Sequence, residues 1–202
     1  MKRILLSVLI VSGVFSAQAN IFEYSVTLSG PNESPVNASP GIGSGTVNYD
    51  DFAHTLQLQV TFSGLIQTNG AGGTSASHLH APTLNPFTGT AGVATTTPSF
   101  AGFPLGVFSG SFSNTLDLTL ASSWNPTYIS NNGNTTAGAE AALAAAMAGG
   151  NAYWNIHSSS LPGGEIRGFL VAVPEPSSLA LAGLGAVGLA ARVWSKRRAK
   201  KS

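Results

Sequence analysis

Apolar and polar residues alternate with a period of two through most of the chain. The clearest run spans 55–62, where every second residue is apolar: Leu56, Leu58, Val60 and Phe62. Such alternation places one face of a strand in a core and the other in water. The pattern predicts further strands at 22–28, 45–49, 75–81, 106–112, 116–120, 152–158 and 165–172, separated by Gly, Pro, Asn and Ser clusters. We therefore predict an all-β fold, an antiparallel β-sandwich of about seven to nine strands.

One segment departs from this period. Residues 136–148 contain eight alanines, and alanine is the best helix former. Asn134 or Thr135 can cap the start, and the glycines at 149–150 end the segment. We predict one short Ala-rich helix that covers an edge or end of the sheet. The Gly- and Asn-rich stretch 65–74 is predicted to be a loop.

The amino terminus has the three parts of a secretory signal. Residues 1–3 are basic, residues 4–15 are apolar, and Ala17 and Ala19 form a small-x-small cleavage site. Signal peptidase is therefore expected to cut after Ala19.

The carboxyl terminus also has three parts. Pro174, Glu175 and Pro176 form a turn that detaches the tail, because proline continues neither strand nor helix. The apolar stretch that follows reaches the length of a membrane span, about 17–20 residues, only if 176–194 is counted in full. Six Lys and Arg lie between 192 and 201 and are expected to stay in the cytoplasm. We predict a marginal C-terminal membrane-spanning helix.

This tail resembles the PEP-CTERM sorting signal of Gram-negative bacteria, on Pro174, Glu175, Pro176, the apolar stretch and the basic end. The resemblance implies an exosortase partner and export across the inner membrane. It also implies transient anchoring there, followed by a cell-surface or extracellular location. An ordinary single-span anchor remains the alternative. The expected organisation is a signal peptide at 1–19, one domain at 20–172 and the sorting tail at 173–202.

The charge of the exported part differs from that of the whole chain. The chain has a net charge of +1, but between the signal and the tail seven acidic residues face a single cation, Arg167, which makes the body −6. A body of this charge cannot neutralise phosphates, so nucleic acid is not an expected partner. There is no cysteine, which excludes thiolate zinc sites, iron–sulfur clusters and thiol catalysis.

Three histidines are the main candidates for chemistry. His78 and His80 lie two apart in a predicted strand, so both imidazoles point to one face, and His157 lies in another strand. Imidazole nitrogens bind zinc and copper, and three of them leave an open coordination position. One hypothesis is thus a single Cu or Zn site. The alternative is that these histidines are structural, with Ser77 and Asn155 as hydrogen-bond partners.

Glu165 and Arg167 share a face of the last predicted strand. Arg167 is expected to clamp a buried carboxylate, that of Glu165 or Asp117, although an anionic ligand is a second interpretation. His54, beside Asp50 and Asp51, is expected in a turn and outside any site. No nucleophile elbow, zinc-protease motif or phosphate loop is present, so we expect no enzymatic activity.

The body, over 21–172, resembles the CHRD domain, a module of exported proteins. The residues that carry the resemblance are Leu28–Gly30, Glu33, Pro35, Ser77–His80, Asn151–His157 and Pro162–Gly168; Trp154, Ile156 and the serines at 158–160 depart from the family pattern. The resemblance implies an extracellular β-sandwich, Ig-like or superoxide-dismutase-like, without an established activity.

The predicted function is a cell-surface or matrix binding and structural module, associated with exopolysaccharide or envelope components. The alternative is a single-site Cu or Zn binding domain, with redox activity as a further option.

Overall fold

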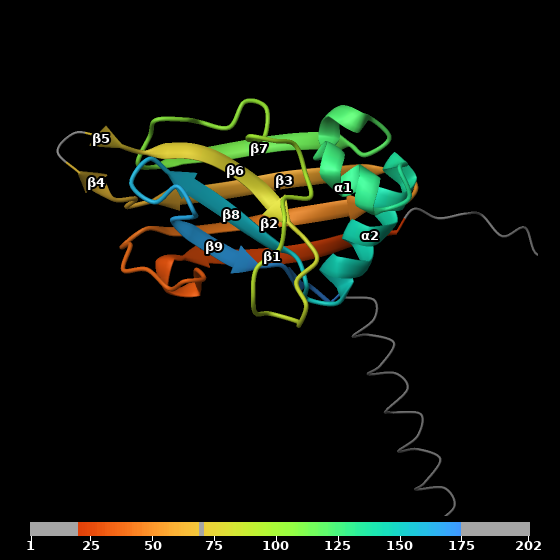
Figure 1. Ribbon diagram of the computed structural model, residues 1–202, viewed down its shortest axis with the longest axis horizontal. Coiled ribbons are helices and arrows are strands. Elements are labelled where there is room, and N and C mark those ends of the chain that lie inside the picture. The colour runs from red at the N-terminus through yellow and green to blue at the C-terminus, as the bar shows by residue number, and fades with distance from the viewer. Residues whose placement is uncertain (1–19, 69–70, 175–202) are drawn as a thin grey trace, which may run out of the picture.

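A computed structural model describes residues 20–68 and 71–174 (Figure 1). Eight strands form one antiparallel sheet in the order β6-β8-β9-β1-β2-β3-β7, with β10 also paired to β1. They are β1 Ile21–Ser29, β2 Ile42–Asp50, β3 Thr55–Ser63, β6 Thr74–His80, β7 Gly110–Asp117, β8 Tyr153–Ser158, β9 Ile166–Phe169 and β10 Val171–Ala172. A small hairpin pairs β4 Gln67–Thr68 with β5 Ala71–Gly72.

The all-β, antiparallel prediction is confirmed, but the sandwich of two sheets is wrong. Strand β1 pairs with β2 along its whole length, and its other edge pairs with β10 and, at Ser29, with β9. The sheet is therefore continuous and curls into a half-barrel around the core. A period-two pattern specifies which face of a strand is buried, but not which strands share an edge, so it could not distinguish the two architectures.

The predicted helix is present as α2 Thr136–Ala148, and the Thr135 hydroxyl caps it by accepting from the Gly138 amide. A second helix was missed, α1 Pro126–Asn131, which Asn125 caps through the Thr127 amide. Six residues are too few to show a helical period. Both helices lie at one end of the curled sheet, and the β4–β5 hairpin lies at the other (Figure 1). The remaining helical turns are η1 Gly30–Asn32 and η2 Ala121–Ser123.

Four predicted segments differ in detail. The predicted strands at 106–112 and 116–120 are one strand, β7, because all of β7 pairs with β3. The predicted strand at 165–172 is divided into β9 and β10. The predicted loop at 65–74 contains the β4–β5 hairpin and the first residue of β6.

Strand β8 is buried on both faces, and this positions the candidate site. One face carries Trp154 and Ile156 into the core, where both are fully buried and the Trp154 indole donates to the Ser77 hydroxyl. The other face carries Tyr153, Asn155 and His157, all buried as well. The connection between β6 and β7 bonds to this second face, as described below, and so shields it from solvent.

Within the described residues, no helix is long and apolar enough to cross a membrane. The predicted signal peptide at 1–19 and the predicted membrane helix at 176–194 lie outside the described residues.

Candidate metal centre

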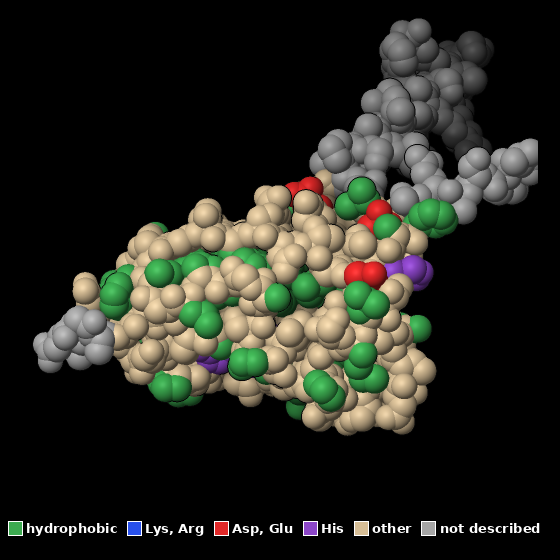
Figure 2. Space-filling model, turned by 90° about the horizontal axis from the view of Figure 1, so that it is seen from above, with side chains coloured by type: hydrophobic (Ala, Val, Ile, Leu, Met, Phe, Trp, Pro, Cys, Tyr) green, Lys and Arg blue, Asp and Glu red, His purple; other side chains and the backbone are tan. Residues whose placement is uncertain are grey.

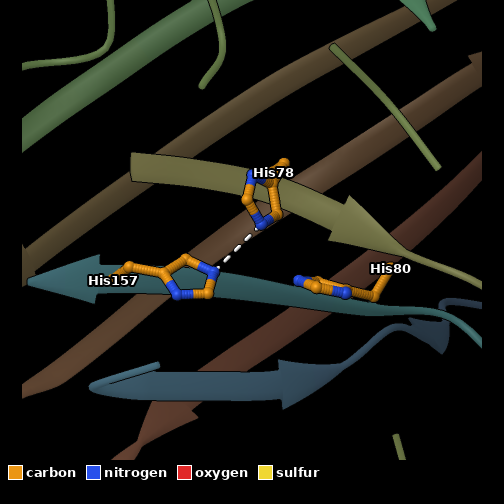
Figure 3. Close-up of side chains that lie close together, drawn as sticks. All are labelled: His78, His80 and His157. Atoms are coloured by element: carbon orange, nitrogen blue, oxygen red, sulfur yellow. Dashed lines mark hydrogen bonds between the residues drawn. The ribbon is translucent and has the colours of Figure 1, made fainter. Parts of the chain in front are cut away.

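The three candidate histidines lie together on one face of β6 and β8. His78 and His80 belong to β6, His157 belongs to β8, and antiparallel pairing sets His78 opposite Asn155 and His80 opposite Tyr153. The rings point toward one another (Figure 3). One ligand atom from each histidine lies within 4.8 Å of the other two. The register of β6 on β8 therefore brings together residues that are far apart in the sequence.

Backbone carbonyls hold the Nδ1 atom of every ring. A carbonyl oxygen can only accept, so each Nδ1 carries the proton, and the Nε2 of a neutral ring keeps its lone pair. Metal-binding histidines are oriented by the same kind of contact. The Nδ1–oxygen pairs are His78 with Pro98 at 3.0 Å, His80 with Ala91 at 2.8 Å and His157 with Pro162 at 2.9 Å.

The Nε2 atoms face one another without a proton donor. The Nε2 atoms of His78 and His157 lie 2.9 Å apart, and the buried Nε2 of His80 has no hydrogen-bond partner among the described residues. If one Nε2 took the proton to bridge the pair, the Nδ1 of that ring would instead face a carbonyl as a second acceptor. Unpaired buried acceptors of this kind are costly. A cation or a proton donor that contacted the Nε2 atoms would remove that cost.

Burial keeps the three rings neutral. It lowers the pKa of His78 to about 3, with the neighbouring His80 and His157 lowering it further. Burial also lowers the pKa of His80 to about 4 and lowers the pKa of His157. Protonation is therefore a poor way to fill the centre of the cluster at neutral pH.

Tyr153 and Arg167 orient the ring of His80. The Tyr153 ring stacks on His80 with centroids 4.7 Å apart and planes 4° apart. The Arg167 guanidinium carbon lies 4.7 Å from the centre of the Tyr153 ring. Three layers of planar groups therefore restrict the rotation of His80.

Arg167 is a buried clamp, but its carboxylate partner is not the predicted one. Its Nε lies 3.8 Å from an oxygen of Glu33, whereas Glu165 and Asp117 were expected. Arg167 also donates to the carbonyls of Asn32 and Gly89, and so joins the β1–β2 and β6–β7 connections. Burial raises the pKa of Glu33 to about 7, and the charge of Arg167 opposes that rise.

Glu165 acts separately from Arg167. It is fully buried, and its Oε1 accepts from the Ser39 hydroxyl at 2.7 Å and from the Ile66 amide. Glu165 therefore ties two other connections, β1–β2 and β3–β4, to the start of β9. The predicted structural role is compatible with these contacts, while the predicted Glu165–Arg167 pair is not.

Two further expectations concern the neighbours of the histidines. Ser77 and Asn155 were expected to bond the imidazoles, but the Ser77 hydroxyl donates to a carbonyl of β8, and the Oδ1 of Asn155 is buried without a partner. His54 lies in the turn between β2 and β3, as expected, and its Nδ1 bonds Glu140 on α2 at 2.9 Å. The carbonyls that hold the rings belong to loops, for which the sequence holds no signal.

A family model for the CHRD domain matches residues 24–170. The chain belongs to the CHRD family. The CHRD match contains all three histidines, Glu33, Glu165 and Arg167. No match was found among curated proteins or among solved structures.

The tail of this CHRD protein matches a second model, the PEP-CTERM protein-sorting motif, over residues 172–198. The match confirms the resemblance of Pro174, Glu175 and Pro176 to that signal. The motif implies an exported protein that an exosortase processes and that is sorted to the cell surface.

Proposed function

We propose that the CHRD domain of this protein binds one copper or zinc ion through the Nε2 atoms of His78, His80 and His157. One observation carries the proposal: among the described residues, three buried imidazoles bring their ligand atoms within 4.8 Å of one another, while carbonyls take the Nδ1 proton of each ring. A tetrahedral ion with ligands at 2.0–2.1 Å separates the ligand atoms by about 3.3 Å. Two of these nitrogens lie 2.9 Å apart and all three ligand atoms lie within 4.8 Å of one another, so binding needs ring shifts of up to about 1.5 Å. The proposal is for binding, with no catalytic or redox step.

The loop carbonyls support this proposal. Each ring already donates its Nδ1 proton, so the tautomer that binds a metal is present before any ion arrives. The site therefore needs no change of proton position, only a movement of the rings toward a common point. Preorganisation of this kind raises affinity, because little ordering remains to be done on binding.

Metal content of the exported protein tests the proposal. We expect about one equivalent of copper or zinc by elemental analysis in the wild type, and loss of that ion in the double variant His78→Ala, His80→Ala. The matched control is His54→Ala, which removes a histidine outside the cluster and should keep the ion. A wild-type protein that neither contains nor takes up either metal would leave the histidines with a structural role.

A second candidate function is a surface or matrix module that binds exopolysaccharide or envelope components. The outward face of the sheet favours it, because uncharged hydroxyl and amide side chains lie in register across four strands. One such row is Ser25, Thr46, Gln59 and Ser113, and the next is Thr27, Ser44, Thr61 and Ser111. Figure 2 shows one side of the domain, on which uncharged groups predominate and acidic side chains gather at one end.

Co-sedimentation with exopolysaccharide of the producing cells tests this second candidate. Replacing Gln59 and Thr61 with alanine removes two exposed polar groups of adjacent rows and should weaken retention. The control is Leu84→Ala, because Leu84 is exposed and lies outside this face. Equal retention of all three proteins would exclude this face as the binding surface.

The tail is proposed to direct the processing of the exported protein. We propose that the apolar segment holds the protein in the inner membrane until exosortase cuts near Pro174, after which the domain is released or re-attached outside. The mass of the mature protein, from cells with and without the exosortase, tests this step. A mature protein that retains its basic end in cells with the enzyme would indicate an ordinary anchor.

A further inference from the structure

The charge balance of the three-histidine site restricts the ion that it can hold. Neutral imidazoles are the ligands, and within the described ranges no Asp or Glu belongs to the cluster. A bound ion would therefore keep its full charge, since nothing in the ligand set neutralises it. Most buried divalent ions are accompanied by anionic ligands or by a bound hydroxide.

The nearest charged groups do not supply a negative charge either. Arg167 lies on the same side of the sheet, against the Tyr153 ring that stacks on His80. The carboxylate of Glu33 faces Arg167, and the two largely cancel. The surroundings of the cluster are thus neutral to slightly positive.

Burial increases the free-energy cost of placing an uncompensated charge at this site. His78, His80 and His157 are 6%, 8% and 9% exposed. The Born cost of moving an ion out of water rises with the square of its charge, so a divalent ion costs about four times as much as a monovalent ion of equal radius. Imidazole suits both copper and zinc, so the ligand type does not decide between them.

We propose that the site selects copper(I) over zinc(II), because a buried, uncharged donor set without a nearby uncompensated carboxylate favours a monovalent ion. The inference rests on the proposed function, and it names the ion for the same three ligands. Copper(I) also accepts three ligands without a fourth, which matches the number that the cluster offers.

Competition titrations of the exported protein test the selection. Copper(I) is titrated anaerobically with ascorbate against a chromophoric copper(I) chelator, and zinc(II) against a chromophoric zinc chelator. We expect copper(I) to bind more tightly by more than about tenfold. Zinc(II) binding that equals or exceeds copper(I) binding would overturn the inference while leaving the proposed function intact.

A single added charge tests the physical reason. Asn155 lies between His78 on β6 and Arg167 on β9, two residues before His157, and among the described residues its Oδ1 is buried without a partner. Asn155→Asp keeps the shape and adds a carboxylate to a residue whose Cβ lies about 5 Å from that of the ligand His78. The added charge attracts zinc(II) twice as strongly as copper(I), so the ratio of copper(I) to zinc(II) affinity should shift toward zinc by about tenfold or more.

Asn48→Asp is the matched control, because Asn48 lies on β2, beyond β9 and β1 in the sheet. It should leave the ratio unchanged. Equal ratios in the two variants would refute the charge argument. If Asn155→Asp does not fold, the comparison of copper(I) and zinc(II) affinities in the wild type still tests the proposed selection. A wild type that binds neither ion would refute the proposed function and, with it, the selection.

Discussion

Arg167→Met tests whether the buried clamp stabilises the domain. Methionine keeps the apolar stem of the arginine, so the change removes mainly the charge and the donors. Glu33 then lies buried without its counter-charge, and the carbonyls of Asn32 and Gly89 lose a donor. We expect the variant to fold, and its free energy of unfolding to be lower.

The expected loss in the free energy of unfolding follows from the contacts of Arg167. Removing one partner of a buried ion pair costs about 3–5 kcal/mol, because the other charge remains buried. For a domain of 150–250 residues, each kcal/mol lowers the melting temperature by about 2–4 °C. At pH 8 the melting temperature should therefore fall by roughly 6–20 °C.

The loss should depend on pH through Glu33. Its pKa is raised from 4.5 when unfolded to about 7 when folded, so the folded protein holds the proton more tightly, and wild-type stability falls as pH rises between these values. Without Arg167 the folded pKa rises further, and the fall continues above pH 7. At pH 5 Glu33 is protonated in both proteins, which leaves a loss of about 1–3 kcal/mol from the hydrogen bonds.

The melting temperatures of the wild type and of Arg167→Met are measured at pH 5 and pH 8 by circular dichroism, with a chelator present. The double variant Arg167→Met, Glu33→Gln removes the buried charge and should recover part of the stability at pH 8. A change in melting temperature that is the same at both pH values, or absent, would refute the account of Arg167 as a charge clamp.

Three further predictions follow from other contacts. Copper or zinc at 100 times its Kd should stabilise the wild type by about 2.7 kcal/mol, and His78→Ala, His80→Ala should abolish the rise in melting temperature on adding the ion. The Glu140 carboxylate raises the pKa of His54, so this pair stabilises the domain at low pH and less as pH rises through the folded pKa; NMR titration should show a lower pKa for His54 in Glu140→Gln. Leu79→Ala removes a fully buried side chain from β6 and should cost about 2–5 kcal/mol in chemical denaturation, while elemental analysis still finds the ion.

Local features were predicted well because they depend on neighbouring residues. The alternation at 55–62 predicted β3, and the alanines, Thr135 and the glycines after 148 predicted α2 with its bounds. The missed helix α1 is short and lacks an apolar stripe. Even the shared face of His78 and His80 follows from the period of a strand, without knowledge of the fold.

Long-range features were not predicted, because sequence spacing holds no information on strand pairing. The curled sheet depends on the contact of β1 with β9 and β10, which lie more than 130 residues further along the chain. The carboxylate partner of Arg167 was expected to be Glu165 or Asp117, but the fold supplies Glu33, which directly follows the η1 turn.

The sequence alone determined where the protein is sent, which residue types it offers for chemistry, and which side of each strand they occupy. These depend on composition and on short periods. Only the tertiary structure decided that His157 meets His78, that loop carbonyls take the Nδ1 protons, and that no carboxylate of the described residues joins them. Those facts follow from strand register and loop packing. The contact of His157 with His78 joins segments 79 residues apart, and the carbonyl contacts depend on how the loops fold back on the rings.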